Sequence, residues 1–169
     1  WAKTYFKENP TALGFPLGVN DGGGDCRCPE CLKAKAAYGN QYIPFYNETA
    51  RLAKAAFPGK YVGFIAYGGA RPAPRNITLE DNLLVEVTGG MAEDMRQFRE
   101  WRAAGIKHFG LYDYFYGGGY VVPRHYPRLM AQAWRTVAKE FGLLSLWGES
   151  FIKSWIFDGP RQYVLNELA

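Results

Sequence analysis

The sequence predicts an α/β fold, a partial (β/α)8 TIM barrel with parallel strands and crossover helices. Three observations predict it. Apolar runs of strand length recur along the chain, and most are continuously apolar, as in strands that are covered on both faces. Helical periods alternate with these runs, which is typical of a parallel sheet. Polar and aromatic residues gather just after the runs, as they do at the C-terminal face of a barrel.

The first half of the chain contains three predicted strands. A helix precedes the first of them, 15–19, and a loop rich in glycine and cysteine follows it. A helix is predicted over 42–57, where Pro44 occupies the first turn, a position that tolerates proline. The strands 61–67 and 83–87 come next and are joined by a basic loop.

The second half of the chain continues the alternation of helices and strands. The predicted elements are a helix over 91–104, a strand over 108–112, a helix over 126–141, a strand over 143–147 and a last helix after Gly159-Pro160. Gly105 and Gly142 follow the first two of these helices and act as stop signals. No linker divides the chain, so 1–169 is interpreted as a single domain, a partial barrel.

An open doubly wound sheet is the alternative architecture. The segment DGGGDC (21–26) places glycines after a strand, but it lacks the G-x-G-x-x-G spacing of dinucleotide-binding sheets. No helix is predicted to start directly from it. The partial barrel is therefore favoured.

The composition limits the classes of partner. The net charge of +4 is scattered, with no run of Lys or Arg, so nucleic acid is not an expected partner. No apolar stretch approaches about 18 residues, and no membrane segment is expected. Aromatic residues make up 17% of the chain, and many lie beside glycines and carboxylates. Tyrosine and tryptophan combine a flat apolar ring with a polar group, which suits the binding of a sugar ring.

Carboxylates stand at or just past four of the predicted strands: Asp21, Glu86, Asp113 and Glu149. Glycoside hydrolysis needs two carboxyl groups, one protonated as the acid and one ionised as nucleophile or base. If the last strand is the eighth of a barrel, Asp21 ends strand four and Asp113 ends strand seven. These two ends lie on opposite sides of a barrel mouth, so we expect the two side chains to face each other across a bound sugar.

The candidate catalytic residues are thus Asp21, Asp113 and Glu149. The candidate substrate-binding residues are Asn20, Tyr67, Tyr112, Tyr114, Tyr116 and Trp147. The alternative for an aspartate after a strand is a helix cap or a turn. Glu86 lies inside an apolar strand and is expected to point into the barrel, with Arg71 or Arg75 as a neutralising partner.

The cysteines Cys26, Cys28 and Cys31 are spaced C-x-C-x-x-C and are the three cysteines of the chain. Structural zinc usually has four ligands, so a zinc site here needs a fourth ligand that is not a cysteine. A disulfide leaves one thiol over and is strained across a single intervening residue. A structural zinc, a disulfide and three free thiols all remain open, whereas catalysis needs no cofactor.

Four segments carry a resemblance to a known family: LGVNDGGGDCRCPECL (17–32), YVGFIAYGGARPAP (61–74), GLYDYFYGGGY (110–120) and DGPRQYVLNEL (158–168). They resemble a bacterial domain-of-unknown-function family, numbered 4838. The resemblance implies a glycosidase-type TIM barrel, distantly similar to α-glucuronidases and β-hexosaminidases, in a secreted or periplasmic protein of polysaccharide-degrading bacteria. It also implies that the chain is the C-terminal part, about strands 4 to 8, of such a (β/α)8 barrel, so that 1–169 is a partial glycosidase-like TIM barrel. In such barrels the acid comes from the end of strand four, which corresponds to Asp21 here.

We therefore expect a carbohydrate-active hydrolase domain that acts on an oligo- or polysaccharide. The alternative is a non-catalytic carbohydrate-binding domain with the same aromatic cleft. A partial barrel has two exposed sheet edges, and exposed edges favour pairing with another chain. We accordingly expect a homo-oligomer that covers these edges if the domain stands alone.

Overall fold

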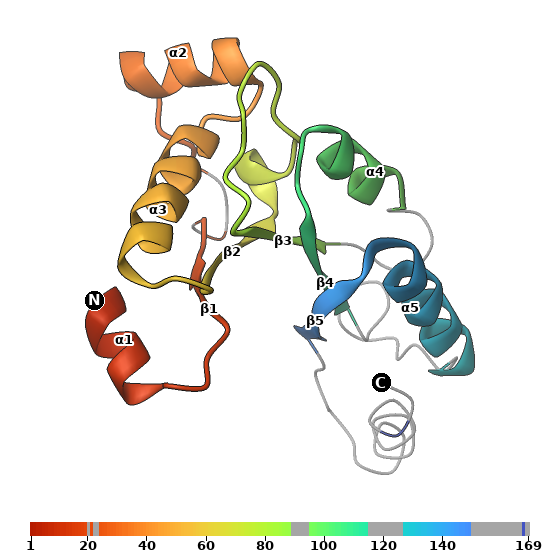
Figure 1. Ribbon diagram of the computed structural model, residues 1–169. Helices are drawn as coiled ribbons and strands as arrows, with labels where there is room; N and C mark the ends of the chain where they lie inside the picture. The colour runs from red at the N-terminus through yellow and green to blue at the C-terminus, as the bar shows by residue number, and fades with distance from the viewer. Residues whose placement is uncertain (20, 22–23, 89–94, 115–126, 150–166, 168–169) are drawn as a thin grey trace.

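Five parallel strands form one sheet in the computed structural model (Figure 1), which describes residues 1–19, 21, 24–88, 95–114, 127–149 and 167. The elements are α1 (Ala2–Glu8), β1 (Gly14–Leu17), α2 (Pro29–Tyr38), α3 (Ile43–Ala56), β2 (Tyr61–Ala66), η1 (Gly68–Ala70), β3 (Leu83–Thr88), α4 (Met95–Ala103), β4 (His108–Tyr114), α5 (Pro127–Phe141) and β5 (Leu143–Glu149). Strand order in space is the same as in sequence, and every neighbouring pair is parallel. The last predicted helix falls almost wholly outside the described residues.

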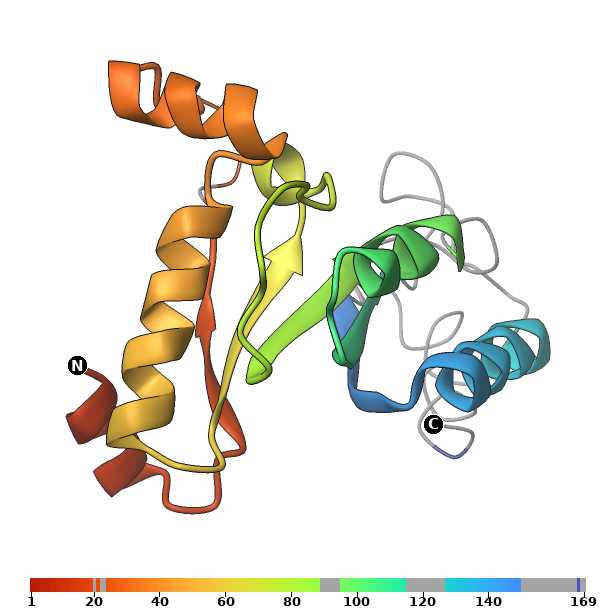
Figure 2. The same ribbon diagram turned by 45° about the horizontal axis from the view of Figure 1, so that its top comes forward.

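The sheet is curled into a half-barrel, with α3, α4 and α5 around its outside (Figures 1 and 2). The curl shows in the contact between Tyr61 of β2 and His108 of β4, whose rings approach to 4.7 Å although β3 lies between the two strands. We call the side toward the helices the convex face and the opposite side the concave face. The predicted fold class, a partial α/β barrel, is confirmed.

The hydrophobic core lies between the convex face and the helices. Phe64 of β2 stacks on Tyr46 of α3 at 4.3 Å and meets Trp101 of α4 edge-on at 5.5 Å. Alternate residues of each strand point to opposite faces, so the core takes every second side chain, such as Val62 and Phe64 in β2. The residues between them are left for the concave face.

The helix α2 was not predicted, because it buries no residue and so has no apolar stripe that a pattern search detects. Its termini do carry ordinary signals. Cys28 is the N-cap, Pro29 opens the first turn, and Gly39 ends the helix with a φ of 75°, a left-handed conformation that glycine adopts easily. Two of the three cysteines therefore lie at the start of a helix and not in a loop.

The observed strands differ from the predicted ones by one or two residues at their C-terminal ends. β1 ends at Leu17, whereas β4 and β5 continue to Tyr114 and Glu149. The extension matters for the site because it places Asp113 and Glu149 inside strands, where the alternation of the backbone decides which face each side chain occupies.

Candidate active site

Neighbouring residues of β4 point to opposite faces of the sheet. Phe109 packs against Phe98 of α4 and Phe141 of α5, each at 5.6 Å, so it lies on the convex face. Alternation then places Leu111 and Asp113 on that face and Tyr112 on the concave face.

Tyr112 is the centre of a cluster at the C-terminal end of the sheet. Its ring meets that of Trp147 edge-on at 4.5 Å, and its hydroxyl donates a 2.6 Å hydrogen bond to Oε1 of Glu149. Tyr112 pairs with Trp147 in the β4–β5 register, and Tyr114 pairs with Glu149. Trp147 is 46% exposed, so one large aromatic surface is available on the concave face.

Asp21 and Tyr67 lie at the same end of the sheet, in the segments that follow β1 and β2. Tyr67 follows β2 and donates a 3.1 Å hydrogen bond from its hydroxyl to Oδ1 of Asp21, four residues beyond the end of β1. Burial raises the pKa of Tyr112, and the hydrogen bond to Glu149 and the nearby charges, Asp21 among them, raise it further. The charges of Asp21 and Glu149 thus both act on the phenol of Tyr112. Asp21 lies in the loop after β1, and Glu149 lies at the end of β5.

Glu86 lies deeper on the concave face, in the middle of β3. Its Oε1 accepts a 3.0 Å hydrogen bond from the Ser145 hydroxyl. Burial raises the pKa of Glu86, while hydrogen bonding by Trp147 and Ser145 lowers it in part. The expected inward direction of Glu86 is confirmed, but its hydrogen-bond donor is Ser145 and not Arg71 or Arg75.

Asp113 does not face Asp21 across the mouth, and the predicted arrangement of these two residues is wrong. The Asp113 side chain is fully buried on the convex face. Its Oδ2 accepts a 2.8 Å hydrogen bond from the indole N–H of Trp134 in α5, and its Oδ1 accepts one of 2.7 Å from the backbone N–H of Tyr114. These contacts indicate a structural carboxylate that fastens α5 to β4.

The remaining predicted binding residues divide into two groups. Tyr114 is partly buried, and its ring lies 5.5 Å from that of Tyr112, so it borders the cluster. Asn20 and Tyr116 lie outside the described residues.

Ser145 is a member of the site that was not predicted, because a lone serine in an apolar strand carries no motif. Only the register with β4 brings it to Glu86.

The three cysteines form a separate cluster at the start of α2. Their sulfur atoms all lie within 4.8 Å of one another, so the group can bind a metal ion. All three are free cysteines, and the disulfide alternative is not formed. Hydrogen bonds from the neighbouring cysteines lower the pKa of Cys26, whereas hydrogen bonding to Cys28 raises the pKa of Cys31 to about 12.

The loop before α2, which carries Cys26, is tied to the residues just before α3. The Tyr42 hydroxyl donates a 2.7 Å hydrogen bond to Oδ1 of Asp25, and the Gln41 amide donates one of 3.3 Å to the carbonyl of Cys26. The same loop holds Asp21 further upstream. The cluster is therefore in a position to anchor the loop next to the candidate site.

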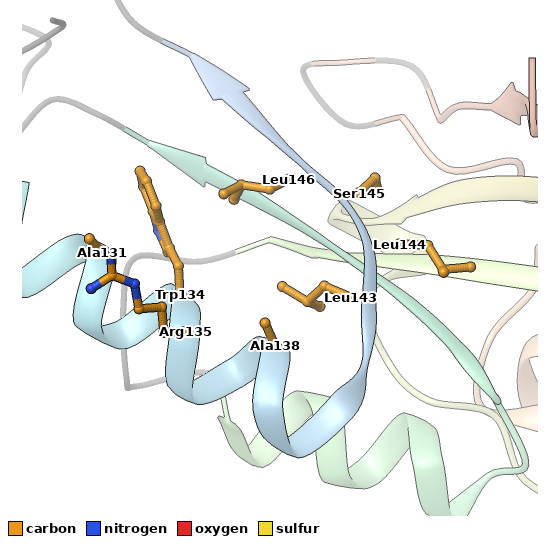
Figure 3. Close-up of a pocket in the computed structure, with 8 residues that line it drawn as sticks. All are labelled: Ala131, Trp134, Arg135, Ala138, Leu143, Leu144, Ser145 and Leu146. Atoms are coloured by element: carbon orange, nitrogen blue, oxygen red, sulfur yellow. The ribbon is translucent and has the colours of Figure 1, made fainter. Parts of the chain in front are cut away.

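A pocket of about 220 Å³ opens between α5 and β5 (Figure 3). Trp134, Leu143 and Leu146 line it, and none of its lining residues is acidic. It lies on the convex side, where Trp134 contacts Asp113. Glu86, Glu149 and the exposed ring of Trp147 are on the opposite, concave face, so this pocket is not part of the candidate active site.

A comparison with known protein families identifies the family of the chain. Residues 2–169 match the family described as Domain of unknown function (DUF4838). The chain belongs to this family. The predicted resemblance to DUF4838 is thereby confirmed over nearly the whole chain, whereas its likeness to glycoside hydrolases stays a prediction. No curated protein and no solved structure matches the chain.

Proposed function

We propose that this DUF4838 chain is a carbohydrate-active hydrolase domain, which cleaves glycosidic bonds with a pair of carboxylates at the C-terminal ends of its strands. The observation that supports it is the cluster at the C-terminal end of the sheet, where Glu149 accepts a hydrogen bond from Tyr112 beside the exposed ring of Trp147, and where the charge of Asp21 acts on the same phenol. Two carboxylates next to an aromatic platform are the groups that glycoside hydrolysis requires.

Asp21 lies in the loop after β1 and Glu149 at the end of β5, and β1 and β5 are the two outer strands of the sheet. In this proposal Asp21 serves as acid and base, and Glu149 as the nucleophile or base. Tyr67 and Tyr112 fix the two carboxylates through their hydroxyl groups. Trp147 supplies the surface on which a sugar ring stacks.

A non-catalytic carbohydrate-binding domain is the second candidate, since an exposed tryptophan beside tyrosines binds sugars without any chemistry. Asp21→Asn and Glu149→Gln distinguish the two candidates. Turnover is measured as release of reducing ends from a panel of soluble bacterial and plant polysaccharides, and affinity by calorimetry on the same panel. A hydrolase loses turnover in both variants and keeps its affinity.

The matched control is Asp81→Asn, which removes a surface carboxylate that pairs with Lys54 at 2.6 Å, far from the concave face. This variant is expected to keep full turnover. Binding without turnover in the unmodified protein favours the binding domain, and neither binding nor turnover on the whole panel rejects both candidates.

We also propose that the cysteine cluster is a structural zinc site with a fourth ligand that is not a cysteine. Thiolates are preferred zinc ligands, and the three sulfur atoms are already gathered at the start of α2. Zinc there supplies no chemistry to the hydrolase. It holds the loop between β1 and α2 against the residues before α3.

The sheet edges are the basis for a proposal on assembly. In the described part of the chain, β1 and β5 each pair with one strand only. We propose that a second copy of the chain covers these edges when the domain stands alone. Light scattering that shows a stable monomer at high concentration contradicts the proposed assembly.

None of the helices in the described residues has the length and apolarity that crossing a membrane requires.

A further inference from the structure

Cys28 and Cys31 belong to the same turn, the first turn of α2. Cys28 is the N-cap and Pro29 the first helical residue. The N–H of Leu32 donates a 3.0 Å hydrogen bond to the Cys28 carbonyl, which closes the turn. Residues three apart in a helix are neighbours on its surface. The two cysteine side chains therefore start from adjacent positions of one helical turn.

The distances in this turn suit a disulfide bond between Cys28 and Cys31. Their sulfur atoms lie within 4.8 Å of each other, and both cysteines are free. In a helix of standard geometry, Cα atoms three residues apart are separated by about 5 Å. Disulfides usually join Cα atoms that are about 4.4–6.8 Å apart. Rotation of the two side chains is therefore enough to form the bond, and the backbone keeps its place.

Cys26 is the third thiol of the cluster and is held outside this turn. It is exposed, whereas the other two cysteines are half-buried. The carbonyl of Cys26 accepts a 3.3 Å hydrogen bond from the Gln41 amide, and the preceding Asp25 accepts one of 2.7 Å from the Tyr42 hydroxyl. A bond from Cys26 to Cys28 spans a single residue and is strained. These features favour a bond within the helix, with Cys26 left as a thiol.

We propose that Cys28 and Cys31 are a redox-active dithiol, which reacts with low-molecular-weight disulfides and closes a disulfide bond within the first turn of α2. Cys26 stays reduced in this reaction. The dithiol acts on its own chemistry and does not depend on the proposed hydrolase activity.

The reaction is thiol–disulfide exchange in two steps. The thiolate of one cysteine of the pair attacks a sulfur atom of the small disulfide, forms a mixed disulfide with it and releases one small thiolate. The thiolate of the other cysteine then attacks the cysteine sulfur of the mixed disulfide. The Cys28–Cys31 bond forms, and the second small thiolate leaves. The pair thus loses two hydrogen atoms and is oxidised, while the small disulfide is reduced to two thiols.

The dithiol and the proposed zinc site use the same sulfur atoms, so disulfide formation and metal binding exclude each other. Zinc is bound by thiolates, and the sulfur atoms of a disulfide are no longer thiolates. Oxidation of the pair leaves Cys26 as the one thiolate among the three cysteines and should release a bound metal ion. Helix α2 buries no residue, so a new bond in its first turn leaves the hydrophobic core unchanged.

Peptide mapping tests the pairing, because trypsin cleaves between the cysteines. Cleavage after Arg27 and Lys33 places Cys28 and Cys31 together in peptide 28–33 and leaves Cys26 in peptide 8–27. The metal-free protein is equilibrated with oxidised glutathione and an excess of reduced glutathione, which keeps mixed disulfides of single thiols rare. It is then alkylated in denaturant and digested. We expect peptide 28–33 to lack two hydrogen atoms and to carry no alkyl group, and peptide 8–27 to be alkylated.

Single serine variants are the controls. Cys26→Ser should change the ratio of oxidised to reduced Cys28–Cys31 pair less than about twofold. Cys28→Ser or Cys31→Ser should lower oxidation of the remaining partner about tenfold or more, because no second thiol completes the exchange. Serine is a good N-cap residue, so Cys28→Ser keeps the helix. Cross-linked peptides 8–27 and 28–33 would show a disulfide to Cys26 and overturn the proposal. Alkylation of both cysteines in peptide 28–33 would overturn it as well.

A cobalt titration separates the dithiol from the proposed zinc site. The reduced protein should show the absorption of cobalt bound to thiolates, and the oxidised protein should lose most of it. If the reduced protein binds no cobalt, the zinc proposal fails alone, and the peptide map still decides whether Cys28 and Cys31 pair. Full cobalt absorption in protein whose peptide 28–33 is oxidised would contradict the use of the same sulfur atoms.

Discussion

The Tyr112 hydroxyl donates a 2.6 Å hydrogen bond to Oε1 of Glu149, and the two residues come from neighbouring strands, β4 and β5. Ionising this phenol would remove the hydrogen-bond donor and place a second negative charge beside a carboxylate. Burial and that hydrogen bond accordingly raise the pKa of Tyr112. At pH values below this raised pKa the phenol keeps its proton and remains the donor to Glu149.

Tyr112→Phe should lower kcat/KM on any substrate of the domain about tenfold, because Glu149 loses the contact that holds its carboxylate in place. The ultraviolet difference titration of the unmodified protein against this variant should show no ionising phenol near the usual tyrosine value of about pH 10. Tyr38→Phe, a tyrosine in α2, serves as the control for the loss of one hydroxyl. A Tyr112 that ionises at the usual pH contradicts the shielded environment.

Asp113→Asn should destabilise the fold by about 2–3 kcal/mol in urea unfolding, because the amide cannot accept both of the hydrogen bonds that the buried carboxylate accepts. Trp134→Phe removes the indole donor and should cost less, about 1–2 kcal/mol, since the carboxylate keeps the hydrogen bond from the backbone N–H of Tyr114.

The same pair of variants tests the correction to the predicted site. Both should bind polysaccharide as the unmodified protein does, because neither side chain reaches the concave face. A stable Asp113→Asn variant without turnover would restore Asp113 as a catalytic residue.

Asp113 and Glu149 show where prediction from the sequence reached its limit. Both follow apolar runs beside aromatic residues, and both were expected at the mouth. In a continuously apolar strand nothing in the sequence tells which residues face the helices, since both faces are hydrophobic. The shift in register between Phe109 and Gly110 also cannot be counted from the sequence, and it decides that Glu149, in line with Tyr114, lies on the concave face.

The fold was predictable to a greater extent because it depends on coarser signals. The order of strands and helices follows from apolar runs, helical periods and glycine stops, which a shift of one or two residues does not disturb. Helix α2 is the exception, and it buries no residue. The grouping of the cysteines was visible from their spacing, whereas the Glu86–Ser145 contact depends on side chains two strands apart.

Gly110→Ala should destabilise the domain by about 1–3 kcal/mol, because the added methyl group enters the space above Gly110 that the Ser145 and Glu86 side chains fill. Gly110→Ala combined with Ser145→Ala should recover part of this loss, since the hydroxyl is the nearest obstacle. Gly18→Ala is the matched control, as no atom lies within 4 Å of a Cβ placed there. If Gly110→Ala unfolds at the same urea concentration as the unmodified protein, the space above Gly110 is not tightly packed.

Glu86→Gln should change how stability depends on pH. Burial raises the folded-state pKa of Glu86 above its unfolded value, so the folded state binds the proton more tightly. The stability that this group contributes is complete below the unfolded pKa of about 4.3 and is lost as the pH rises through the folded pKa. The variant, which does not titrate, should therefore gain in Tm relative to the unmodified protein between pH 4 and about pH 7. A constant difference in Tm over this range contradicts the raised pKa.

Zinc should raise the Tm of the reduced protein, and a chelator should reverse the change. Binding that is confined to the folded state stabilises by about 2.7 kcal/mol when free zinc is a hundredfold above Kd. Replacing Cys26, Cys28 and Cys31 together by serine should abolish the effect, whereas Lys33→Ala on the same helix should retain it. Cobalt, as a spectroscopic substitute, should give the charge-transfer absorption of thiolate ligands in the unmodified protein and not in the triple variant. A Tm that is indifferent to zinc and to chelation leaves the cluster as three free thiols, and the loop that carries Asp21 is then held by Tyr42 and Gln41 without a metal ion.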